Sequence, residues 1–352
     1  MTSIALLVFI PLSLGLKYLT GAGPIWLFLT GVIAVAVLAD WVRRATEQLA
    51  ERAGSAIGGL LNVSFGSIAE LVLALFVLAH GQAEVVKAQI TGSIIGTSLL
   101  GLGLAMLVGG FRRERQSFDR ASIGLLSTLL ILVVVALLLP AVFDLRAHAG
   151  MANTQGVDEW LSIGASVVLL LLYGANLVFT LVTHRDIFAG EESSGTSAWS
   201  LLRSLAVLIG GTIFIAAESE IVSDAVEATA TLLHVSPVFL GVIVLALVGT
   251  SADLFAAVAF ARQDRMSLVF SICIGSAIQM ALVVAPILVL ASWLIGHPMN
   301  LVFDPLDLFA IAGAAFIVRA IAADGETNWF EGLLLVGVYV LLGLAFFFVG
   351  PA

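Results

Sequence analysis

The chain of 352 residues is 61% hydrophobic and only 11% charged, and its formal net charge is −9. Soluble globular domains carry about 25% charged residues, and a soluble chain this apolar would have too little polar surface to stay dissolved. The composition therefore indicates an integral membrane protein, and the negative charge without a basic patch disfavours a nucleic-acid partner.

Apolar runs long enough for a membrane-spanning helix, about 20 residues, recur along the whole chain. The first, "MTSIALLVFIPLSLGL", has no basic segment and no cleavage site, so we interpret it as a membrane helix rather than a signal peptide. The runs do not alternate as barrel strands would, so the expected class is all-α and polytopic. The eleven expected helices cover residues 4–20, 24–41, 57–79, 85–109, 121–143, 159–183, 200–224, 237–261, 267–294, 304–322 and 329–349.

Basic residues predict the orientation, because cytoplasmic loops carry an excess of Lys and Arg. With the N-terminus in the cytoplasm and the C-terminus outside, twelve of the 15 basic residues fall on the cytoplasmic side. We therefore expect a multi-pass protein of the cell (inner) membrane. The cytoplasmic set is Arg43, Arg44, Arg52, Arg112, Arg113, Arg115, Arg120, Arg185, Arg203, Arg262, Arg265 and Arg319, and the outer set is Lys17, Lys87 and Arg146.

An internal repeat divides the chain into two halves. "GSIAEL" at 66–71 corresponds to "GTSADL" at 249–254, and the offset between them, here called the repeat offset, also carries Gly-Ser at 92–93 onto Gly-Ser at 275–276. Each half holds five expected helices, an odd number, so the halves enter the membrane in opposite directions, as in secondary transporters with inverted repeats. The expected organisation is a first helix (1–22), repeat 1 (23–183), a flexible polar cytoplasmic linker (184–199) and repeat 2 (200–352).

Two acidic residues occupy equivalent positions in the middle of apolar runs, where a charge is costly and usually functional. Glu70 has Ser67 one turn before it, and Asp253 has Thr250 in the same relation. Two antiparallel helices would thus each offer a carboxylate and a hydroxyl to one centre. The alternative is that both acids are structural and bonded to nearby hydroxyls or backbone, but the pairing across the repeat favours an ion site.

Further groups extend this candidate site. A glycine precedes each set, Gly66 and Gly249, and could allow close backbone approach or a broken helix that frees carbonyl oxygens. Hard oxygen donors suit Ca²⁺, Mg²⁺ or Mn²⁺ rather than Zn²⁺ or Cu²⁺. Two carboxylates in a dry site also repel each other, so without a cation at least one is expected to hold a proton. The possible additional oxygen ligands are Ser93, Thr97, Ser276 and Gln279.

A second acidic group lies on the expected seventh helix, in "AAESEIVSDAVEA". Glu220, Asp224 and Glu227 share one helical face, which is compatible with a funnel for cations or with an exposed helix end. Glu220 is the expected auxiliary residue, because it lies deepest in the run.

At these residues the sequence resembles the cation/Ca²⁺ exchanger superfamily, most closely its Ca²⁺/H⁺ antiporter (CAX-type) branch. The resemblance rests on "ATEQLAERAGSAIGGLLNVSFGSIAELVLALFVL" at 45–78, "GSIIGTSLLGLGLAMLVGG" at 92–110, "SEIVSDAVEA" at 219–228, "LGVIVLALVGTSADLFAAVAFA" at 240–261 and "IGSAIQMALVVAPILVL" at 274–290. It implies eleven helices and cation binding at Glu70 and Asp253, with Ser67, Thr250 and Gln279 as polar partners. The branch usually has Asn at the positions of Ser67 and Thr250, Asn near Thr97, and Glu at the position of Asp253.

These observations predict a secondary antiporter that exchanges a divalent cation, with Ca²⁺ the expected one, for protons carried by the same two acids. The departures from the branch leave Na⁺ coupling open, and also a non-transporting, cation-sensing protein of the same fold. No nucleophile and base are arranged for catalysis, so we expect neither an enzyme nor a cofactor. The expected partners are the lipid bilayer and inorganic cations, and the sequence does not indicate an oligomeric state.

Overall fold

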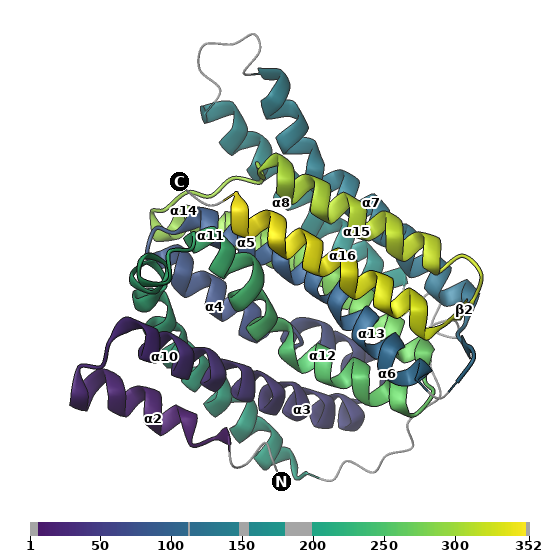
Figure 1. Cartoon of the computed structure of the whole chain (residues 1–352), viewed down its shortest axis with the longest axis horizontal. Coiled ribbons are helices and arrows are strands. Elements are labelled where there is room, and N and C mark those ends of the chain that lie inside the picture. The colour runs from purple at the N-terminus through teal and green to yellow at the C-terminus, as the bar shows by residue number, and fades with distance from the viewer. Residues whose placement is uncertain (1–5, 112, 148–154, 180–198, 350–352) are drawn as a thin grey trace.

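In the computed structural model the described residues are 6–111, 113–147, 155–179 and 199–349, and side chains are left out at 20, 54–60, 62–64, 145–147 and 155–158. The described chain forms 11 helical segments and one antiparallel pair of two-residue strands (Figure 1). The expected all-α class is confirmed. The expected linker at 184–199 lies outside the described residues up to position 198.

The first helix and the first half account for six segments. They are α2 (Phe9–Gly15) with the π-helical turn η1 (Leu16–Thr20), α3 (Pro24–Phe65), α4 (Ile68–Ala79), α5 (Ala83–Ile95) running through the π-helical turn η2 (Gly96–Gly101) into α6 (Leu102–Gly110), α7 (Arg120–Ala147) and α8 (Gln155–Val178).

The second half accounts for five. They are α10 (Leu201–Leu233), α11 (Pro237–Phe239) running through η4 (Leu240–Leu245) into α12 (Ala246–Arg262), α13 (Met266–Gln279) running through η5 (Met280–Val284) into α14 (Ala285–Ile295), α15 (Pro305–Ile321) and α16 (Trp329–Phe348). The strands β1 (Gln116–Ser117) and β2 (Glu326–Thr327) join the loop after α6 to the loop after α15.

Within the described ranges, 8 helices are long and apolar enough to cross a membrane, and two shorter apolar helices cover Phe9–Leu19 and Ile68–Ala79. The chain is therefore a multi-pass membrane protein. Its fold is a first helix followed by two inverted repeats of five helices each, as the sequence predicts.

The second and third expected helices differ from the prediction. The sequence predicts separate helices at 24–41 and 57–79, but α3 continues without interruption from Pro24 to Phe65 and the chain then breaks at Gly66 and Ser67. The segment that follows position 41 contains no proline, and ion pairs spaced one turn apart support it as a helix. Those pairs are Asp40–Arg44 at 2.8 Å and Arg43–Glu47 at 2.6 Å.

Three helices form a group along one side of the molecule: α2, α3 and α10, at the lower left of Figure 1. Val42 of α3 packs against Gly211 of α10, and Val222 of α10 packs against Gly31 of α3. The remaining segments form the larger body, and α4 lies where the group and the body meet. This boundary positions the candidate site.

The repeat is visible in local geometry as well as in sequence. The repeat offset carries η2 (Gly96–Gly101) onto 279–284, and η5 (Met280–Val284) occupies that stretch. π-Helical turns are rare and concentrate at functional sites. Each of these two lies directly beside a predicted ligand, because η2 contains Thr97 and η5 follows Gln279.

Candidate cation-binding site

The centre of the site is the contact between α4 and α12. Glu70 stands in the first turn of α4, immediately after the break at Gly66 and Ser67, and its side chain is 2% exposed. A Cβ atom added at Gly249 of α12 would lie 2.6 Å from the Cγ atom of Glu70. The Glu70 side chain therefore packs directly on the α12 backbone, which only glycine permits at that point.

The Glu70 carboxyl group is buried without a well-formed hydrogen bond. Within the described part of the chain, neither Glu70 oxygen has a hydrogen-bond partner. Ser67 interacts with it electrostatically, but the Ser67 hydroxyl donates to Oε1 of Gln279 at 3.1 Å. An unpaired charge in the bilayer interior is costly, so this carboxyl group requires a bound proton or a cation.

Asp253 has a different environment. It is partly exposed and lines a cavity of about 200 Å³, and it interacts electrostatically with Glu70 across the helix contact. Ser276 and Arg43 also interact with it. The cavity is lined by Arg43, Gly66, Asp253, Ser271, Ile272, Gly275, Ser276 and Gln279. Both repeats thus contribute to one site, since Gly66 belongs to the first and Asp253 to the second.

Of the two possibilities that the paired glycines allow, a helix break follows Gly66 and a close backbone approach occurs at Gly249. The chain leaves helical geometry at Ser67, with φ −100° and ψ 19°, whereas α12 runs through Gly249 without interruption. The irregular turn on that helix is η4, which ends at Leu245, about one helical turn before Gly249. Free backbone carbonyls are therefore expected beside Gly66 and not beside Gly249.

The other predicted ligands divide into three groups. Gln279 and Ser276 line the cavity. Thr250 and Thr97 are buried, and each hydroxyl donates 2.9 Å back to a carbonyl in its own helix, that of Ala246 or Ser93. Such back-bonding satisfies the hydroxyl proton and leaves the oxygen lone pairs available. The Ser93 hydroxyl is buried, and no described group bonds to it.

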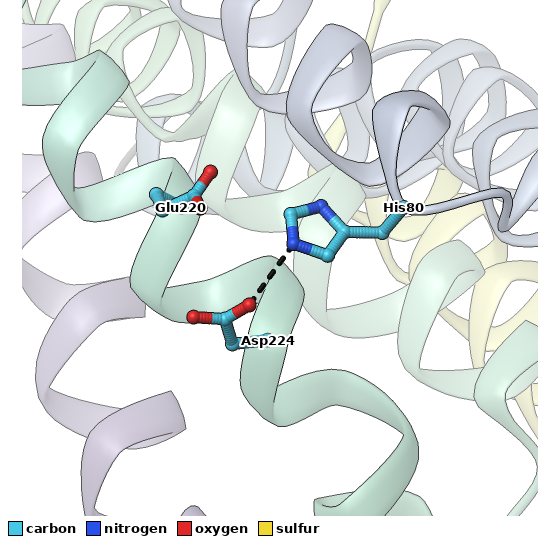
Figure 2. A group of neighbouring side chains, drawn as sticks. All are labelled: His80, Glu220 and Asp224. Atoms are coloured by element: carbon cyan, nitrogen blue, oxygen red, sulfur yellow. Dashed lines mark hydrogen bonds and ion pairs between the residues drawn. The ribbon is translucent and has the colours of Figure 1, made fainter. Parts of the chain in front are cut away.

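Glu220 does not lie at this centre. It belongs to a cluster with His80 and Asp224 at the C-terminal end of α4, where the three side chains offer ligand atoms within 4.8 Å of one another (Figure 2). His80 Nε2 is 2.9 Å from Oδ1 of Asp224, and Lys17 Nζ is 2.9 Å from Oδ2. A contact with His80 and an ion pair with Lys17 thus occupy the two oxygens of Asp224, and they connect the first helix, the end of α4 and α10.

Two charged groups among those that the sequence did not single out are a buried glutamate and a half-buried arginine. Glu218 of α10 is fully buried, and both of its oxygens are 2.6 Å from the Ser13 hydroxyl of α2. It shares a helical face with the buried residues Ile215 and Val222, and this spacing could have revealed it. Arg43, expected in a cytoplasmic loop, lines the cavity from α3, and only the continuity of α3 places it there.

Comparisons with known proteins agree with this arrangement. The chain matches the family described as "Sodium/calcium exchanger protein" over residues 23–182 and 203–348. A Ca²⁺/H⁺ antiporter of Aphanothece halophytica is 38% identical over 359 residues, covering 97% of this chain and 95% of the relative. The Ca²⁺/H⁺ antiporter ChaA of Bacillus subtilis is 38% identical over 330 residues, covering 91% of this chain and 92% of the relative.

Solved structures agree in fold. The structure of native YfkE superposes with a TM-score of 0.86 at 34% identity, covering 99% of this chain and 100% of that chain. The H⁺/Ca²⁺ exchanger CAX superposes with a TM-score of 0.74 over 99% of this chain and 92% of that chain, and at 16% identity it supports the fold alone. The chain therefore belongs to the sodium/calcium exchanger protein family and, among the cation/Ca²⁺ exchangers, to the Ca²⁺/H⁺ antiporter (CAX-type) branch.

Proposed function

We propose that this chain is a secondary active antiporter that exchanges Ca²⁺ for protons, with both ions using Glu70 and Asp253. One observation carries the proposal: the Glu70 carboxyl group is buried, has no hydrogen-bond partner among the described residues, and lies against the helix that bears the second acid. The names of three relatives, each a Ca²⁺/H⁺ antiporter at 38% identity, support the same exchange.

The chemistry follows from charge. Without a cation the two carboxyl groups repel each other in a medium of low dielectric, so a proton on at least one of them stabilises the site. A divalent cation removes the repulsion and displaces the proton. The expected oxygen ligands are Glu70, Asp253, Ser67, Gln279 and Ser276, with free backbone carbonyls beside Gly66, and such a set suits Ca²⁺. The ions are substrates, and the exchange requires no resident cofactor.

The route to the site is expected to be from the cytoplasm. Arg43 belongs to the Arg-rich ends that predict the cytoplasmic side, and it lines the cavity that reaches Asp253. By the same bias, the cluster of His80 and Asp224 lies on the outer side. We therefore propose a protein of the cell (inner) membrane, with its N-terminus in the cytoplasm and its C-terminus outside, that exports Ca²⁺.

A second candidate is exchange of Ca²⁺ for Na⁺. The family is described as one of sodium/calcium exchangers, and the "GTSADL" motif has hydroxyl groups where the CAX-type branch usually has an amide. Replacing Na⁺ by choline in the transport assay separates the two: Na⁺-coupled flux would stop, whereas proton-coupled flux would continue.

The test is uptake of Ca²⁺, Mn²⁺ and Mg²⁺ by proteoliposomes under an imposed pH gradient. We expect Ca²⁺ flux that depends on the gradient and is lost in Glu70→Gln. Wild-type protein without pH-dependent flux of any divalent cation would contradict the proposal, as would unchanged flux in the variant. Equilibrium binding of Ca²⁺ without flux would instead favour a cation-sensing role.

A further inference from the structure

A positive charge lines the cavity that is expected to admit a cation. Among the eight described residues around this cavity, Arg43 is the only basic one, and the other polar groups offer oxygen atoms. A guanidinium group keeps its proton at any pH that the protein experiences. A divalent cation bound at Asp253 would therefore be repelled by Arg43 unless the guanidinium group moved away.

Arg43 has two carboxylate neighbours, one lining the same cavity and one on its own helix. It interacts electrostatically with Asp253 in the cavity, and its Nη1 atom is 2.6 Å from Oε1 of Glu47, one turn further along α3. Its Nε atom is buried and has no hydrogen-bond partner in the described part of the chain. The Arg43 side chain is 16% exposed and that of Glu47 is 39% exposed, so Glu47 lies closer to solvent than the guanidinium group that it binds.

These positions allow one guanidinium group to serve either carboxylate. We propose that Arg43 is a tethered counter-cation: from the pair with Glu47 that the structure shows, it can move onto Asp253 when no cation is bound, and it returns to Glu47 when Ca²⁺ enters. This inference rests on the proposed function and deepens it, because it assigns to Arg43 a direct influence on Ca²⁺ affinity. Competition from Arg43 weakens Ca²⁺ binding and thereby favours the release that transport requires.

The counter-cation belongs to one repeat only. The repeat offset carries Arg43 onto Val226, a fully buried apolar residue of α10. Glu70 therefore has no equivalent basic neighbour from the second repeat. Arg43 would compete with Ca²⁺ in the conformation where this cavity is open. The affinity of the site for Ca²⁺ would therefore differ between the conformations open to the two sides of the membrane.

The neighbouring Arg44 provides a matched control. It lies on the same helix, pairs with Asp40 at 2.8 Å, is 48% exposed and does not line the cavity. Equilibrium Ca²⁺ binding to purified protein in detergent is measured by calorimetry for wild type, Arg43→Gln, Arg44→Gln and Glu47→Gln. We expect Arg43→Gln to bind Ca²⁺ about tenfold more tightly, and Arg44→Gln to remain within about twofold of wild type.

Glu47→Gln should change affinity in the opposite direction, because Arg43 then has no second partner and stays at Asp253. Soluble guanidinium ion should weaken Ca²⁺ binding to Arg43→Ala, which has space for it, and should leave wild type unaffected. A purely structural Arg43 predicts neither result. Arg43→Lys should stay close to wild type.

Equal or weaker binding by Arg43→Gln, or an equal gain in Arg44→Gln, would overturn the inference while leaving the antiporter proposal intact. Wild type that neither binds nor transports Ca²⁺ would overturn both. Where Arg43→Gln does not fold, the sign of the Glu47→Gln effect decides.

Discussion

The two repeats place equivalent acids in different surroundings. Glu70 is enclosed and without a hydrogen-bond partner among the described residues, whereas Asp253 lines a cavity and interacts with Ser276 and Arg43. The helix of the first acid begins directly after a break, and that of the second runs through the equivalent glycine. One motif, present twice, therefore supplies a closed half-site and an open one.

Two equivalent glycines show the same contrast. A Cβ atom at Gly92 would lie 2.0 Å from the carbonyl oxygen of Val242, whereas a Cβ atom at Gly275 would meet nothing within 4 Å. Gly92 thus forms a tight contact between α5 and η4, and Gly275 faces the cavity. An exchanger with inverted repeats can use this asymmetry, because exchanging the two packings would move the opening to the other side of the membrane.

Removing the charge of either acid is expected to have the largest effect. Glu70→Gln and Asp253→Asn should each lower Ca²⁺ flux at least ~100-fold, because a buried ionic ligand is lost. Without Ca²⁺, the Glu70→Gln variant should have a free energy of unfolding about 1 kcal/mol higher than that of Asp253→Asn. The reason is that Asp253→Asn weakens the interactions with Ser276 and Arg43, whereas Glu70 has no hydrogen-bond partner among the described residues to lose. Flux in proteoliposomes and unfolding in detergent measure these two effects. Equal stabilities would remove the distinction between the two acids.

The paired glycines give the next largest effect. Gly92→Ala should destabilise the protein by about 1–3 kcal/mol, because the methyl group meets backbone that cannot yield cheaply. Gly275→Ala should change stability by less than about 0.5 kcal/mol, since its position is open. It should nevertheless slow Ca²⁺ flux, because in the conformation that opens to the other side of the membrane Gly275 would form the close contact that Gly92 forms here. Denaturation together with flux separates the two variants, and a Gly275→Ala that is the less stable of them would contradict the comparison.

Chemical accessibility should differ between two other equivalent positions. Ser271 lines the cavity, and the repeat offset relates it to Ala88, which is 1% exposed. In a Cys273→Ser background, we expect Ser271→Cys to react with a membrane-impermeant thiol reagent from the cytoplasmic side. Ala88→Cys should react at least ~10-fold more slowly, because its burial limits access to the thiol. Similar labelling rates would indicate that the two halves are open alike.

Sequence predicted the part of this asymmetric site that depends on composition and spacing. Eleven helices, the repeat and the acids at 70 and 253 follow from hydropathy and the repeat offset, and the structure brings those acids together. The difference between the halves was not predictable, because it comes from packing. Gly66 marks a possible break, but Gly249 marks one equally and α12 runs through it. The place of Arg43 at the cavity depends on the continuity of α3 past position 41.

The end of α4 away from the cavity should contribute a smaller, pH-dependent amount to the free energy of unfolding. The hydrogen bond to the Phe76 carbonyl, and after it the interaction with Asp224, raise the pKa of His80 above its ordinary value. The protonated His80 imidazole therefore stabilises the folded state fully below about pH 6.5, and this contribution is lost as the pH rises through the folded-state pKa. Because the contact is partly exposed, His80→Gln should cost no more than about 1 kcal/mol at pH 6 and close to nothing at pH 9. Thermal unfolding at the two pH values measures this, and an equal cost at both would indicate that the His80–Asp224 contact holds the end of α4 against α10 without a charge.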